Sequence, residues 1–241
     1  MFRGTHWHGR ESFKNIIVFG GSYCKSSKSE TWINRMKKRL REHSNSVKVH
    51  NFASPGATAE DDLSDQLLRF FMMFPKKDPS DPTSVLDPAT TTFYLSFLYS
   101  RSTRQGQLTF LEAVLDGVDD LYTKAGARNF VLVDIPPIDH SPQAADSGSM
   151  DKIEERVKAW NIILKRGTAE FATSTKPATT VLFSSYRVLM EVLEEPCEFD
   201  FNEDDPTTEG GGIWADDLHL TVDMHDILAE RLLTSLFPST V

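Results

Sequence analysis

The sequence predicts an α/β protein in which a parallel sheet carries helices on both faces. Five short apolar segments, each bounded by turn residues, are typical of strands that are buried on both faces. They cover residues 15–19, 47–52, 92–98, 129–135 and 179–183. Amphipathic segments lie between them, and this alternation is typical of parallel strands joined by right-handed crossovers.

The helices are predicted from apolar side chains spaced three and four residues apart. The first contains Trp32, Met36 and Leu40, and the second runs from Leu63 to Phe74, where Pro75 stops it. Three more cover residues 107–123, 152–171 and 222–236. We expect a single domain over residues 1–241 in which residues 1–14 are a loosely ordered extension. Two long irregular loops, residues 75–91 and 194–212, are expected to flank the substrate pocket. Loops commonly carry substrate specificity.

The composition argues against several functional classes. The net charge is −9, from 26 basic and 35 acidic residues, and no strong basic patch is visible, so a nucleic-acid partner is disfavoured. No apolar run approaches the roughly 18 residues of a membrane span, and the N-terminus has no hydrophobic signal segment. Cys24 and Cys197 form neither a disulfide framework nor a metal-ligand pattern. We expect a cytoplasmic enzyme without a membrane span, metal or cofactor.

Ser22 follows the first predicted strand directly, in the stretch "FGGSY" of residues 19–23. Parallel sheets place their chemistry at the carboxyl ends of strands. A nucleophilic serine there needs backbone N–H groups around it and a base within hydrogen-bond reach. Gly20 and Gly21 allow the tight backbone that this requires. Taken alone, the motif fits a serine that closes a turn better, because short glycine motifs are common.

A second motif, "WADDLHLT", spans residues 214–221 and places Asp216 three residues before His219. A carboxylate at this spacing can hold the imidazole in the tautomer whose other nitrogen accepts a serine proton. An acidic loop with one surface histidine explains the motif alone about as well. His225, at the start of the last helix, is attributed to helix capping, and His140 is given a minor structural or pocket-lining role.

Together these motifs resemble the SGNH (GDSL-type) serine hydrolases, and most closely their fungal acetyl-esterase branch. The blocks follow the order of that family over nearly the whole chain: "FGGSY" (19–23), "NFASPGAT" (51–58), "VLVDIPPIDHSP" (131–142), "AWNIIL" (159–164), "VLFSSYRVLMEVLEEP" (181–196) and "WADDLHLT" (214–221). The resemblance implies a three-layer α/β/α, flavodoxin-like sandwich with a central five-stranded parallel sheet. It also implies ester hydrolysis through an acyl-serine.

The resemblance assigns roles to individual residues. Ser22 corresponds to the nucleophile, His219 to the general base and acid, and Asp216 to the group that orients His219. The backbone N–H groups of Ser22 and Gly56 correspond to two oxyanion donors. Gly21 and Tyr23, which flank the nucleophile, are candidate substrate contacts.

The chain departs from the family pattern at two places. Gly21 replaces an aspartate, and we expect this loss to soften the site without removing its chemistry. In the third block, Leu98, Ser100 and Arg101 stand where the family has glycine, asparagine and aspartate. Ser100 is the candidate third oxyanion donor, although a hydroxyl reaches less far than an amide. Losing one such donor typically costs about 10²–10³ in rate.

Arg101 and Arg104 carry a separate hypothesis. A basic pair beside the pocket could hold an anionic part of the substrate, whereas two solvated loop arginines are the simpler interpretation. The predicted function is a serine ester hydrolase that cleaves a short-chain acyl or acetyl ester of a small molecule. An acyltransferase with the same residues, or a catalytically impaired binding protein that lacks the third-block asparagine, are the alternatives.

Overall fold

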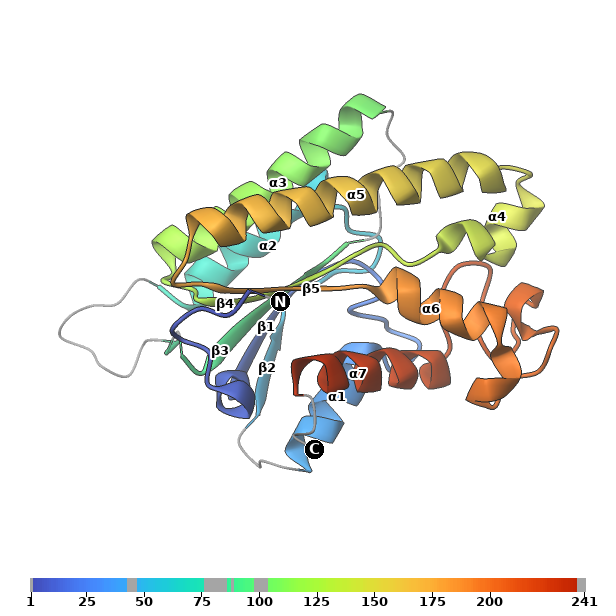
Figure 1. The fold of residues 1–241 in the computed structure, drawn as a ribbon, viewed down its shortest axis with the longest axis horizontal. Helices are drawn as coiled ribbons and strands as arrows, with labels where there is room; N and C mark the ends of the chain where they lie inside the picture. The colour runs from blue at the N-terminus through green and yellow to red at the C-terminus, as the bar shows by residue number, and fades with distance from the viewer. Residues whose placement is uncertain (1, 43–46, 76–85, 88, 98–103, 238–241) are drawn as a thin grey trace.

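The central sheet has five parallel strands in the order β2-β1-β3-β4-β5 (Figure 1). The computed structural model describes residues 2–42, 47–75, 86–87, 89–97 and 104–237, without the side chains of residues 104–110. The strands are β1 (Asn15–Gly20), β2 (Lys48–Asn51), β3 (Thr91–Ser96), β4 (Asn129–Val133) and β5 (Thr179–Phe183). The chain turns from one side of β1 to the other between β2 and β3. The switch point, where ligands bind in such sheets, therefore lies between β1 and β3.

Helices cover both faces of the sheet and form the outer two layers (Figure 1). One face carries α1 (Trp32–Arg41), α6 (Ser185–Glu194) and α7 (Val222–Leu236). The other carries α2 (Ala59–Met73), α3 (Arg104–Lys124) and α5 (Met150–Ser174). The short helix α4 (Pro142–Asp146) follows β4. This arrangement confirms the three-layer α/β/α prediction.

Each strand supplies side chains to two separate cores. In β1, Ile16 and Val18 pack in the core with α1 and α7, whereas Ile17 and Phe19 pack with α2 and α3. All four side chains are fully buried. Alternate residues of a strand point to opposite faces, so a strand covered on both sides must be apolar throughout. This is why the strands were visible in the sequence.

The prediction of a loose segment at residues 1–14 does not fit the contacts of residues 2–14. Phe2 exchanges two backbone hydrogen bonds with Thr180 of β5, at 2.9 and 2.8 Å. Trp7 packs against Phe13 and Phe237, with ring centroids 5.6 and 6.3 Å apart. Aromatic side chains at single positions therefore anchor this segment, and their irregular spacing gives no periodic signal.

The two long loops differ in their relation to the carboxyl edge of the sheet. The expectation that the first flanks the pocket is wrong for its described ends, because Pro75 follows α2 and Thr91 opens β3 at the amino edge. In the second loop, the Asp205 carboxylate accepts N–H groups of Asn202 and Gly212, at 2.7 and 2.8 Å. A Cβ on Gly212 would lie 2.5 Å from that carboxylate, so this glycine permits the approach.

Gln66 of α2 fixes the end of β1. Its side chain is fully buried, accepts the Gly20 N–H at 2.9 Å and donates to the Gly20 carbonyl at 3.0 Å. The same carbonyl also accepts the Ser54 N–H. Only the Gly20 N–H therefore depends on Gln66 for its partner.

We predict that Gln66→Met lowers the free energy of unfolding by about 1–3 kcal/mol, because a buried N–H loses its acceptor while the side-chain volume is kept. Denaturant unfolding followed by circular dichroism measures this change. A loss below about 0.5 kcal/mol would contradict the role given to Gln66.

Candidate active site

Ser22 lies in a tight turn at the carboxyl end of β1. The Cys24 N–H donates to the Gly21 carbonyl at 3.1 Å, which makes Ser22 and Tyr23 the central residues of the turn. The Gly21 N–H donates to the Ser96 carbonyl, at the end of β3, at 3.2 Å. Ser22 is half-buried. The turn therefore stands at the switch point between β1 and β3.

Gly20 and Gly21 allow two close backbone approaches. A Cβ on Gly20 would lie 2.2 Å from the Ser96 carbonyl oxygen, and one on Gly21 would lie 2.9 Å from the Ala57 carbonyl oxygen. Either would force the backbone to move. The replacement of aspartate by Gly21 is thus not a simple loss of support, because it lets the Ser22 turn touch the loop that contains Gly56.

The Gly56 loop is fastened to this turn. Ser54 donates its N–H to the Gly20 carbonyl, and Ala57 donates to Ser54, both at 3.1 Å. Gly56 has a φ of +77°, in the left-handed region that favours glycine. In the described part of the chain, the N–H groups of Ser22 and Gly56 have no hydrogen-bond acceptor. Two neighbouring loops therefore present unpaired amide hydrogens.

Asp216 and His219 form a pair within one loop. Both carboxylate oxygens of Asp216 lie 2.9 Å from His219 Nδ1. Oδ1 also accepts the N–H groups of Leu218 and His219, at 3.0 and 2.6 Å. Burial raises the pKa of Asp216, but these hydrogen bonds outweigh it and hold that pKa below its ordinary value. An ionised Asp216 favours the imidazole tautomer with a proton on Nδ1, which leaves Nε2 free to accept one.

The loop that carries this pair is fixed to its surroundings by contacts outside the pair. Trp214 is fully buried and donates its indole N–H to the Pro206 carbonyl at 3.0 Å. The Ala215 N–H donates to the His219 carbonyl at 2.7 Å, and the Gln143 N–H donates to the Asp217 carbonyl at 2.8 Å. The Asp216–His219 pair is therefore held in place before any ligand binds.

The structure brings the Ser22 turn and the His219 loop into contact. Tyr23 O–H donates to the Leu218 carbonyl at 2.8 Å, across 195 sequence positions. The rings of Tyr23 and His219 lie 6.2 Å apart between centroids. Among the hydrogen bonds of the described residues, none joins Ser22 Oγ to His219.

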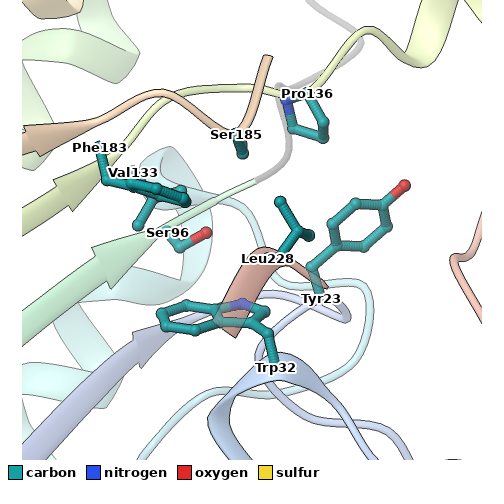
Figure 2. Close-up of a pocket in the computed structure, with 8 residues that line it drawn as sticks. All are labelled: Tyr23, Trp32, Ser96, Val133, Pro136, Phe183, Ser185 and Leu228. Carbon is teal, nitrogen blue, oxygen red and sulfur yellow. The ribbon is translucent and has the colours of Figure 1, made fainter. Parts of the chain in front are cut away.

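A pocket opens beside this turn at the carboxyl ends of β3, β4 and β5. Figure 2 shows the Trp32 ring on one side of it and Pro136 and Ser185 on the other. The lining residues are Tyr23, Trp32, Ser96, Val133, Pro136, Phe183, Ser185 and Leu228. Most of these side chains are apolar, and the space between them holds about one water-sized group.

Of the remaining predicted site residues, the structure describes Gly21 and Tyr23 in full and the others in part or not at all. Ser100 and Arg101 lie outside the described residues, and Arg104 begins α3 with a side chain that is not described. Gly21 and Tyr23, predicted as substrate contacts, are both buried. The Tyr23 side chain is only 5% exposed and its hydroxyl is bonded to Leu218, so it does not face solvent as a surface contact would.

His225 lies next to the site, and the prediction that it caps the last helix is wrong. Thr221, not His225, caps α7 by accepting the Met224 N–H at 3.3 Å. His225 is 3% exposed, and its ring packs edge-on against Tyr23 at 5.9 Å. Burial, and then the nearby His219, lower its pKa to about 3. Its helical register with the buried Leu228, Ala229 and Leu232 is the signal that could have identified it as a core residue.

Metal and membrane features were sought in the described part of the chain. There, no group of three or more His, Cys, Asp or Glu side chains is arranged to hold a metal ion. Every helix of that part is too short or too polar to cross a bilayer. Cys24 is buried, and burial raises the pKa of its thiol to about 12, so it is an inert core residue.

This combination of a parallel α/β sandwich, a serine turn at the switch point and an Asp–His pair is typical of hydrolases that use a serine. The family model of GDSL-like lipases and acylhydrolases matches residues 16–232. The chain therefore belongs to the GDSL-like lipase/acylhydrolase family. A search of curated protein sequences gives no match.

Solved structures with the same fold include esterases. An acetylxylan esterase from Geobacillus stearothermophilus is 11% identical, with a TM-score of 0.59 over 92% of this chain and 93% of that one. A protein from Parabacteroides merdae, provisionally described as a GDSL-like lipase, is 12% identical, with a TM-score of 0.55 over 92% and 96% of the two chains. At these identities the likeness shows the fold.

We predict that His225 makes the protein less stable in mild acid. The unfolded chain binds a proton at this histidine near pH 6.5, whereas the folded protein does so only near pH 3, so the free energy of unfolding falls as the pH drops through this range. The loss from this residue amounts to about 2 kcal/mol between pH 7.5 and pH 5. Denaturant unfolding of wild type and His225→Phe at both pH values measures it. Equal pH dependence in the two proteins would contradict the prediction.

Proposed function

We propose that the protein is a serine esterase that cleaves a short-chain acyl ester of a small molecule through an acyl-serine. The observation that carries this proposal is the contact between the Ser22 turn and the loop of the Asp216–His219 pair, made by the Tyr23–Leu218 hydrogen bond. The two motifs are far apart in the sequence, and a serine that only closed a turn would need no such partner. The unpaired N–H groups of Ser22 and Gly56 beside it also support the proposal.

In the proposed reaction, Ser22 Oγ attacks the ester carbonyl while His219 Nε2 takes its proton. Asp216 stabilises the resulting imidazolium through Nδ1. The negative charge that develops on the carbonyl oxygen is met by the N–H groups of Ser22 and Gly56. The intermediate then collapses to an acyl-serine, and His219 passes its proton to the leaving alcohol. Water, deprotonated by His219, then attacks the acyl carbonyl; the bond to Ser22 Oγ breaks, His219 returns the proton to that oxygen, and the acid leaves.

The hydrogen bond from Ser22 to His219 is not yet formed in this arrangement. In enzymes without substrate, catalytic hydrogen bonds are often long and shorten when the complex forms. The Tyr23–Leu218 hydrogen bond and the ring contact between Tyr23 and His219 keep His219 next to the Ser22 turn. We therefore keep His219 as the proposed base.

The substrate proposal rests on the pocket that Tyr23, the residue after Ser22, helps to line. Its bulky lining leaves room for about one water-sized group, which fits the methyl of an acetyl ester better than a long acyl chain. The structural likeness to an acetylxylan esterase agrees with a small acyl group.

Three further predicted residues remain part of the proposal. Ser100 is proposed as the third oxyanion donor, and Arg101 and Arg104 as contacts for an anionic substrate.

Hydrolysis is preferred over acyl transfer because of the exposure of the base. The side chains of His219 and Asp216 are 40% and 38% exposed, so water has direct access to the imidazole. An acyltransferase with the same residues needs an alcohol or amine that outcompetes this water.

A cytoplasmic location is proposed from the sequence and agrees with the absence of a disulfide among the described residues.

We predict that a fluorophosphonate probe labels wild type and that Ser22→Ala abolishes labelling, because only an activated serine reacts with it. Hydrolysis of p-nitrophenyl acetate should fall at least about 10³-fold in Ser22→Ala and His219→Ala. Longer p-nitrophenyl esters should be poorer substrates.

Ser26 and His140 give matched controls for the proposed nucleophile and the proposed base. Ser26 is a serine in the same segment that is half-buried like Ser22, and His140 lies 3.4 Å from Asp139 in another Asp–His pair. Ser26→Ala and His140→Ala should keep labelling and turnover within about twofold of wild type. Equal labelling of Ser22→Ala and wild type would refute the nucleophile. The absence of both labelling and turnover in wild type would favour a catalytically silent binding protein.

A further inference from the structure

We propose that the Tyr23 hydroxyl is a positioning group that holds the Asp216–His219 pair against the Ser22 turn. This inference rests on the proposed function, since it assigns a role within that site. It adds to the expectation that Tyr23 contacts the substrate, since Tyr23 also lines the pocket.

The proposal starts from the place of one hydrogen bond. Among the described residues, Tyr23 O–H to the Leu218 carbonyl is the only hydrogen bond between residues 20–24 and residues 214–221. The donor is next in sequence to Ser22, and the acceptor is next in sequence to His219. A displacement at either end of this bond therefore moves a proposed reacting side chain.

The Asp216–His219 pair depends on no group outside its loop. All three groups that bond to Asp216 come from Leu218 and His219, so the internal geometry of the pair survives a shift of the whole loop. The Trp214–Pro206 and Gln143–Asp217 hydrogen bonds anchor this loop to other parts of the fold, but neither links it to the Ser22 turn. The Tyr23 hydroxyl supplies that link, and the 6.2 Å ring contact between Tyr23 and His219 limits sideways motion of the imidazole.

The surroundings keep Tyr23 in the donating state. Its side chain is 5% exposed, and burial, with the charge of Asp216, raises its pKa well above the ordinary value. The phenol stays protonated and can only donate to a carbonyl. His225 packs edge-on against the same ring at 5.9 Å and stays neutral, because burial lowers its pKa to about 3. A buried hydroxyl with one acceptor is a rigid link.

Tyr23→Phe tests the proposal, because it removes the hydroxyl and keeps the ring contacts. Tyr94→Phe is the matched control: Tyr94 is fully buried in the same core, and its hydroxyl has no hydrogen-bond partner among the described residues. We expect the Gln143 N–H, which donates to the Asp217 carbonyl of this loop at 2.8 Å, to exchange with solvent about tenfold faster in Tyr23→Phe than in wild type. In Tyr94→Phe this rate should stay within about twofold of wild type.

The kinetic readout separates positioning from general stability. Turnover of p-nitrophenyl acetate per phosphonate-titrated site should fall about 10–100-fold in Tyr23→Phe, since a misplacement of about 1 Å costs rate at this scale. KM should change less than about twofold. A substitution that only destabilised the fold would reduce the number of titrated sites and leave the rate per site unchanged.

Three outcomes would overturn the inference. They are a wild-type exchange rate at the Gln143 N–H in Tyr23→Phe, an unchanged rate per titrated site, or equal effects of Tyr23→Phe and Tyr94→Phe. The exchange measurement needs no catalysis, so it decides the inference even if wild type neither labels nor turns over. A wild type that neither labels nor turns over would refute the proposed function and leave this inference standing.

Discussion

The close packing of backbone at the carboxyl end of β1 is the constraint on which the site depends. Gly20 lies against the carbonyl of Ser96, and Gly21 lies against the carbonyl of Ala57. No side chain larger than hydrogen fits at either position without movement of the main chain. The two contacts join the exit of β1 to the exits of β3 and β2. They leave Ser22 at the switch point, where its own N–H and that of Gly56 have no acceptor among the described residues.

The second half of the site is assembled independently and then attached. Asp216 and His219 are organised by hydrogen bonds within their own loop, and that loop is anchored by the buried Trp214. Tyr23 bridges the two halves. Backbone contacts at Gly20 and Gly21 order the serine turn, so the turn needs no support from a side chain at position 21.

The sequence predicted the sheet well because burial on both faces leaves a continuous apolar record. The last strand and the last helix were placed with the bounds that the structure has, Thr179–Phe183 and Val222–Leu236. Single long-range contacts leave no such record. The anchoring of Trp7, the burial of Tyr23 and the edge-on packing of His225 depend on residues far away in the sequence. The close approach at Gly21 could not be predicted either, since it arises from the path of another loop.

The most direct test of this account is a crystal structure of the protein after reaction with a fluorophosphonate. The account predicts phosphorus on Ser22 Oγ, with one phosphonyl oxygen facing the N–H groups of Ser22 and Gly56. It also predicts His219 Nε2 within about 3.2 Å of the oxygen that links Ser22 to phosphorus. Phosphorus on another residue, or an imidazole far from the adduct with Asp216 still bound to it, would contradict the account.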